Sequence, residues 1–126
     1  MEIREDVRGV ATVLSPVGGL DASTSAAFQA RLLGALGNAG AAHVVVDMAE
    51  VDFISSAGLR AMMIGAKQAR ARGGRLGVAA LTETVREIFE ISKFHLVVPV
   101  FATVSDAVAS LSPPADGPGG GRPRED

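Results

Sequence analysis

The chain alternates between short apolar runs and segments whose apolar residues recur at helical spacing. The short runs predict five strands, at residues 3–6, 10–15, 44–46, 76–80 and 97–100. Arg8 and Gly9 separate the first two strands and predict a hairpin. The third run consists of three valines, which is typical of a strand covered on both faces. Pro99 lacks a backbone N–H, so the last strand is expected at an edge of the sheet.

The segments with helical spacing predict four helices, over residues 21–37, 56–72, 84–89 and 104–111. Thr84 and Glu87 have the spacing of a capping box and predict how the third helix starts. Thr103 and Asp106 have the same spacing at the start of the fourth helix. Strands and helices in this order predict an α/β fold, a single domain with a mixed β-sheet of about five strands flanked by about four α-helices.

Composition limits the kind of protein this can be. A chain of 126 residues, 48% of them hydrophobic, is long enough for one domain with a core. We expect that domain at 1–111 and a disordered tail, rich in proline and glycine, at 112–126. The net charge is −2 and lysine and arginine are scattered, so no direct contact with nucleic acid is expected. Without a signal-peptide pattern or an apolar run of about 18 residues, the expectation is a cytoplasmic protein without membrane insertion.

The residue types also exclude several kinds of site. The absence of cysteine removes disulfides and thiolate metal sites. No Walker loop or Gly-x-Gly-x-x-Gly turn precedes a helix, and His43 and His95 lack metal-ligand spacing, so neither a metal nor another cofactor is expected. Asp47, Glu50 and Asp52 follow the third strand and could form an acid–base pair, although a polar loop at the end of a strand is the more common arrangement.

Residues 51–58, Val-Asp-Phe-Ile-Ser-Ser-Ala-Gly, are the most informative part of the chain. Their adjacent serines precede a predicted helix, where a serine can cap the helix, act as a hydrolase nucleophile or accept a phosphate. A nucleophile elbow requires Gly-x-Ser-x-Gly, but Ile54 replaces the first glycine. His43 precedes the strand that leads to the serines, so it is expected at the opposite end of that strand. The chain is therefore not predicted to be an enzyme.

Helix capping explains only one of the two hydroxyls. Either Ser55 or Ser56 is expected to cap the helix, which stabilises it by about 1 kcal/mol. The small residues Ala57 and Gly58 leave a nearby hydroxyl sterically open, and a glycine also lets another backbone approach closely. This combination favours a site that another protein can reach.

The segment 44–59, with Gly19-Leu20-Asp21 before it and 85–94 after it, resembles the STAS domains of bacterial anti-sigma factor antagonists. The resemblance covers about residues 3–111 and implies partner switching. In such proteins the unphosphorylated form binds an anti-sigma factor that is also a serine protein kinase. Phosphorylation of a serine at a helix N-terminus separates the two proteins, and a serine phosphatase restores the first form.

The resemblance places the phosphate acceptor at Ser56. Many members of the family carry an acidic residue where this chain has Ser55, so Ser55 is an alternative acceptor. The partner-binding residues that the resemblance implies are Asp21, Asp52, Ser55, Ser56, Gly58 and Arg60. An alternative function is that of a STAS scaffold, or of a cytoplasmic subunit of a signalling complex or ABC-type transporter, without a phosphorylation switch. A neighbouring gene for a small kinase or for a permease would distinguish the two functions.

Overall fold

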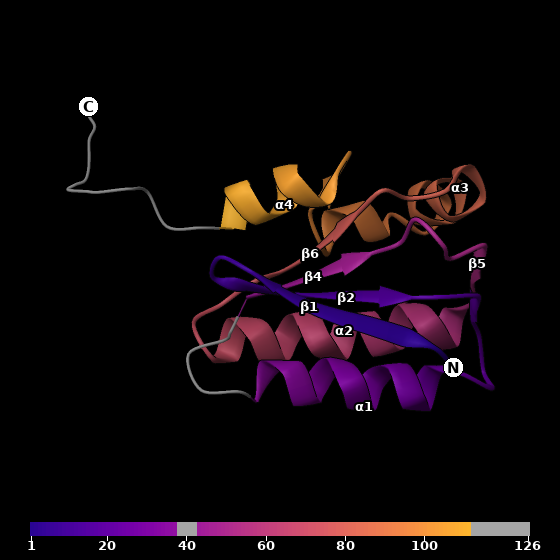
Figure 1. Ribbon diagram of the computed structural model, residues 1–126. Helices are drawn as coiled ribbons and strands as arrows, with labels where there is room; N and C mark the ends of the chain where they lie inside the picture. The colour runs from indigo at the N-terminus through magenta and orange to yellow at the C-terminus, as the bar shows by residue number, and fades with distance from the viewer. Residues whose placement is uncertain (38–42, 112–126) are drawn as a thin grey trace.

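Five strands form a mixed sheet at the centre of the molecule (Figure 1). The computed structural model describes residues 1–37 and 43–111. The strands of the sheet, in spatial order, are β1 (Ile3–Arg8), β2 (Ala11–Pro16), β4 (His43–Asp47), β6 (Leu76–Ala79) and β7 (Val100–Phe101). β1 and β2 are antiparallel and joined at Gly9, whose φ is +62°, and the other neighbours are parallel. The predicted mixed sheet and its N-terminal hairpin are confirmed.

Helices cover both faces of this sheet (Figure 1). They are α1 (Ser25–Leu36), α2 (Ser56–Ala71), α3 (Glu83–Ser92) and α4 (Val104–Leu111), with a 3₁₀ turn, η1 (Phe94–Leu96), after α3. Val44 and Val46 of β4 belong to the larger core cluster, to which α1, α2 and α3 contribute. Val45 belongs to a second cluster with Ala107 of α4. The prediction that the valine strand is covered on both faces is confirmed, because alternate side chains of a strand point to opposite faces.

A second, two-stranded parallel sheet consists of β3 (Gly19–Leu20) and β5 (Phe53–Ile54). Gly19 pairs with Phe53, and Leu20 pairs with Ile54. The sequence pattern did not predict these strands, because two residues are too few to show a period. They matter for function because β5 leads directly into α2.

The start of the third helix differs from the prediction. Helix α3 begins at Glu83 with Thr82 as its N-cap residue, so the capping box expected from Thr84 and Glu87 is wrong. The Thr82 hydroxyl does not cap the helix but donates to the Val51 carbonyl at 2.8 Å. This bond ties the start of α3 to the segment that precedes β5.

The other boundaries are close to those expected. The Asp106 N–H donates to the Thr103 hydroxyl at 3.0 Å, which confirms the cap of the fourth helix. The last strand lies at the edge, as Pro99 indicated, but it covers Val100–Phe101, because Val97 still belongs to the end of the 3₁₀ turn. Residues 112–126 lie outside the described residues, so the disordered tail stays a prediction. In the described ranges, no helix combines the length and apolarity needed to cross a membrane.

Candidate functional site

The two serines of the 51–58 segment lie at the start of helix α2, directly after β5. Ser55 is the N-cap residue, and its hydroxyl accepts a long hydrogen bond from the Gly58 N–H at 3.4 Å. Its own N–H donates to the Leu20 carbonyl at 2.8 Å, and its carbonyl accepts from the Leu59 N–H at 2.9 Å. The structure therefore assigns the capping role, which the sequence left open, to the half-buried Ser55.

Ser56 has a different environment, although it is the next residue. It is the first residue of α2 and is exposed. Its hydroxyl forms no hydrogen bond with any other residue in the described part of the chain. The unpaired backbone N–H groups and the positive end of the helix dipole lie at this end of α2. The first turn of α2 carries no acidic residue, so a negative group on Ser56 meets no like charge within its own helix turn.

Gly58 allows the first turn of α2 to lie directly against β3. A Cβ atom at Gly58 would lie 2.6 Å from the Leu20 carbonyl oxygen and 2.8 Å from Cγ1 of Ile54. The close backbone approach inferred for this glycine does occur, but the approaching backbone is that of the chain's own β3. Gly58 itself is buried. Its role in the structure is to position Ser55 and Ser56, not to present a surface of its own.

Asp21 lies in the loop that follows β3. Its Oδ1 atom accepts hydrogen bonds from the Ser23 hydroxyl at 2.7 Å and from the Ser23 N–H at 2.8 Å. The hydroxyl bond, followed by the backbone bond, lowers the pKa of Asp21, so the carboxylate is ionised at neutral pH. The Thr24 hydroxyl donates to the Gly19 carbonyl at 2.8 Å and closes the loop. Helix α1 consequently begins at Ser25, not at Asp21 as expected.

The carboxylates of Asp21 and Asp52 lie beside Gly19. A Cβ atom at Gly19 would lie 3.7 Å from Oδ2 of Asp21 and 3.8 Å from Oδ1 of Asp52. Asp52 is exposed, and so is Arg60, which shares a helix face with Ser56 because it follows four residues later. Phe53 is also exposed, at 47%. We call Asp21, Asp52, Phe53, Ser56 and Arg60 the serine surface.

The acidic residues after β4 have structural partners. The Asp47 carboxylate accepts from the Ala49 N–H at 3.1 Å and from the Ser15 hydroxyl at 3.5 Å. Glu50 forms an ion pair with Arg4 at 2.9 Å. The polar-loop interpretation of these carboxylates therefore fits better than an acid–base pair. Among the residues that the structure describes, no group of three or more such side chains could hold a metal ion.

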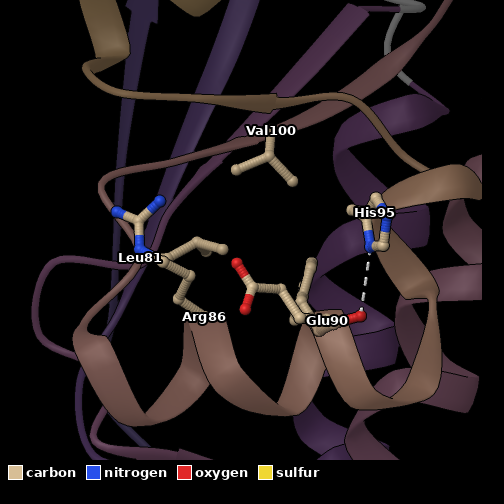
Figure 2. A pocket seen from close by; sticks show the side chains of 6 residues that line it. Leu81, Arg86, Glu90, His95 and Val100 are labelled. Atoms are coloured by element: carbon tan, nitrogen blue, oxygen red, sulfur yellow. Dashed lines mark hydrogen bonds between the residues drawn. The ribbon is translucent and has the colours of Figure 1, made fainter.

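The two histidines are not hydrogen-bonded to either serine. His43 is the first residue of β4, while the serines follow β5, beyond the other end of β4. The His95 ring contacts the Phe89 carbonyl through Nδ1 at 3.3 Å. His95 lies at a separate open hollow of about 320 Å³. Figure 2 shows how the side chains around this hollow are arranged. The residues that line this hollow are Leu81, Arg86, Phe89, Glu90, His95 and Val100. None of them belongs to the serine surface.

Phe53 is the residue of this surface that the sequence analysis missed. The available signal was that Phe53 and Ile54 are neighbours in a strand, because successive side chains of a strand lie on opposite faces and only one of the two can be buried in the core. A two-residue strand gives no longer pattern from which to decide which of the two faces outward. Only the packing of Ile54 in the core shows that Phe53 is the exposed one.

Comparison with known proteins addresses the family and the fold of the chain. A family model described as the STAS domain matches residues 1–107. BtrV of Bordetella bronchiseptica, assigned provisionally as an anti-sigma factor antagonist, is 43% identical over 72 residues. The match covers 57% of this chain and 62% of that relative. The chain thus matches less than two thirds of the length of the relative.

Solved structures show the same fold. A Thermotoga maritima protein with the same provisional assignment has a TM-score of 0.80 at 17% identity, over 86% of this chain and 93% of that one. The antagonist SpoIIAA in its unphosphorylated form has a TM-score of 0.73 at 18% identity, over 86% and 95% of the two chains. Phosphorylated SpoIIAA from Bacillus has a TM-score of 0.67 at 17% identity, over 88% and 100%.

These identities are too low to show more than the fold, whereas the family model covers most of this chain. Within it fall all the residues of the serine surface and the serine pair on which the resemblance rested. The fold, the family model and the relative all agree with the resemblance. The chain therefore belongs to the STAS-domain family.

Proposed function

We propose that this chain is an anti-sigma factor antagonist that works by partner switching. Unphosphorylated, it binds an anti-sigma factor that is also a serine protein kinase, and phosphorylation of Ser56 releases it. The observation that carries the proposal is the exposed Ser56 hydroxyl, which makes no hydrogen bond to the rest of the described chain. The neighbouring Ser55 is half-buried and occupied as the cap of α2, which favours Ser56 as the acceptor.

The fold of the phosphorylated protein is expected to be preserved. A phosphate adds about −1.5 to −2 charge at neutral pH. At the start of α2 this charge interacts favourably with the helix dipole, by about 0.3–1 kcal/mol at an exposed position. The ionised Asp21 and the nearby Asp52 oppose the phosphate, but all three groups lie at the surface, where water and salt screen them. The modification therefore changes the stability of the folded chain little.

The same charge acts much more strongly in an interface. A phosphate that faces an apolar or acidic partner surface loses its hydration without compensation, at a cost of several kcal/mol. A loss of about 3 kcal/mol corresponds to more than a hundredfold in affinity. This term exceeds the effect on folding, so the switch acts on binding.

The rest of the serine surface supplies the partner contacts in this proposal. Asp21, Asp52 and Arg60 are the charged residues of this surface. Gly58 supports it indirectly, because it allows the start of α2 to pack against β3. Ser55 contributes a partner contact at the edge of the serine surface, because it is only half-buried. The proposal places the protein in the cytoplasm, where the kinase has access to ATP. It also requires a serine phosphatase to return the chain to its binding form.

Phosphosite mapping tests the proposal directly. The purified chain is incubated with Mg-ATP and a small ATP-binding anti-sigma kinase from the same genome, and the modified residue is identified by tandem mass spectrometry. We expect phosphate on Ser56, none on Ser56→Ala, and wild-type modification of Ser55→Ala. Phosphate on Ser55 with Ser56 unmodified would reassign the switch. An unmodified wild-type chain that also fails to bind the kinase would overturn the proposal and favour the scaffold or transporter alternative.

A further inference from the structure

We propose that Phe53 is the apolar anchor of the partner interface, and that the anti-sigma kinase receives its ring in an apolar pocket beside Ser56. The inference rests on the proposed function, since it assigns the contact through which the same partner is bound. It assigns to Phe53 a large part of the binding affinity for the kinase, whereas phosphorylation of Ser56 regulates that binding.

The register of the small sheet leaves the Phe53 ring uncovered. Leu20 and Ile54 form one pair across β3 and β5, and both side chains are buried in the core. Phe53 pairs with Gly19 on the outward side and is 47% exposed. Because Gly19 has no side chain, nothing on the neighbouring strand covers the ring from that position. On this face the Phe53 ring lies next to the bare backbone of Gly19, and the carboxylates of Asp21 and Asp52 lie beside that glycine.

Hydrogen bonds hold this face in place. The Gly18 N–H donates to the Glu50 carbonyl at 2.9 Å, and the Gly19 carbonyl accepts from the Thr24 hydroxyl at 2.8 Å. The Ser55 N–H, directly after β5, donates to the Leu20 carbonyl at 2.8 Å. An aromatic side chain on a fixed backbone loses little conformational entropy on binding, which is a property of interface anchors.

The position of Phe53 distinguishes it from other exposed apolar residues. Within residues 1–37 and 43–111, the large apolar side chains that are exposed are Met1, Val7, Val10, Phe53, Ile91 and Leu96. Val7 lies on the edge strand β1, and Ile91 and Leu96 lie on α3 and η1. Phe53 is the member of this set that belongs to the serine surface. Isolated apolar residues are common on protein surfaces, but this one is continuous with the proposed interface.

An anchor of this kind explains why phosphorylation opposes binding. The pocket that receives an aromatic ring must itself be apolar and dry, as at the centre of most interfaces. Ser56 is three residues beyond Phe53, across the turn from β5 into α2. A phosphate on Ser56 would have to lose water at the rim of that pocket, where apolar atoms offer it no hydrogen bonds.

Calorimetric titration with the same purified kinase and ADP tests the inference, because ADP prevents phosphoryl transfer. We expect Phe53→Ala to weaken binding by at least about thirtyfold, as for an interface hot spot. Phe53→Leu should lose less, because it keeps much of the apolar contact. Val7→Ala, at a residue that is 68% exposed on β1, is the matched control and should bind like the wild type.

The outcomes separate the inference from the proposed function. If the kinase binds the wild type and Phe53→Ala equally well, the anchor is overturned while the switch at Ser56 stands. If the kinase binds neither, the proposed function itself has failed. Thermal melting of each variant shows whether it is folded, and Phe53→Gln serves as a second variant of reduced apolarity should Phe53→Ala not fold. A folded Phe53→Gln with wild-type affinity would equally contradict the anchor.

Discussion

Two adjacent residues of one type have different roles in this protein. Ser55 has extended backbone angles, φ −94° and ψ 176°, which allow its hydroxyl to turn back to the first helical turn. Ser56 already belongs to the helix, and its hydroxyl forms no hydrogen bond with another residue in the described part of the chain. Stability and regulation are thus separated between neighbours, and each can be altered without the other.

This separation predicts opposite results for two substitutions. Ser55→Ala should lower the free energy of unfolding by about 0.5–1 kcal/mol, at the low end for a lost cap because the bond is long, and should affect kinase binding less than a change at Ser56 does. Ser56→Asp should leave the free energy of unfolding unchanged or slightly raised, and should weaken binding less than phosphate does, because one carboxylate carries less charge. Urea denaturation and calorimetry measure the two effects.

The matched controls for this experiment lie on the same chain. Ser110→Asp places the same charge on α4, which covers the other face of the sheet, and should leave binding unchanged. Ser56→Ala should bind the kinase but resist release by ATP. Wild-type affinity of Ser56→Asp, or an equal loss in Ser110→Asp, would argue against a charge-operated switch at Ser56.

At the scale of elements, glycines set how closely the helices approach their neighbours. A Cβ atom at Gly65 of α2 would lie 2.3 Å from Cδ2 and 2.8 Å from Cγ of the buried Leu32 of α1. At Gly58 the obstacle is the carbonyl oxygen of Leu20, which cannot rotate away as a side chain can. The first glycine fixes the packing of α1 on α2, and the second fixes the serine surface on β3.

Gly65→Ala should destabilise the fold despite the better helix propensity of alanine. Overpacking costs about 1–3 kcal/mol and the propensity gain returns about 1 kcal/mol, so a net loss of up to about 2 kcal/mol is expected in urea denaturation. Gly34→Ala on α1 is the control, because its Cβ atom meets nothing within 4 Å and should stabilise the chain by a few tenths to about 1 kcal/mol. Equal stability of the two variants would contradict tight packing at Gly65.

At the scale of the whole molecule, one fold brings the serine surface together from distant segments. The family model ends at residue 107, and the last described helix, α4, ends at Leu111. Leu111 is buried in the second core cluster, against the face of the sheet that α1 and α2 do not cover. The elements that complete the core are therefore present by the end of α4.

Removal of residues 112–126 should consequently change the free energy of unfolding by no more than about 0.5 kcal/mol. The deleted segment is rich in proline and glycine and offers few apolar groups for a core. Differential scanning calorimetry of residues 1–111 beside the full chain measures the difference. A large drop in the melting temperature would mean that the tail packs on the domain, and the boundary at residue 111 would then be wrong.

The sequence alone determined the larger architecture. The valine strand, the helices with apolar faces and the N-terminal hairpin depend on periodicity and turn residues within a few positions, so they can be recognised locally. The same local signals, with the serine pair, identified the family. The weakest predictions concerned helix starts, because Thr82 bonds to Val51 across a distance in sequence that no local pattern reveals.

Only the tertiary structure decided how the site is built. The role of Ser55, the burial of Gly58 and the exposure of Phe53 all depend on β3, more than thirty positions earlier in the chain. Leu20 is the common element, since its carbonyl accepts from Ser55 and its backbone fills the space beside Gly58. Such contacts arise from the packing of remote segments, so a pattern of neighbouring residues could suggest the serines but could not distinguish between them.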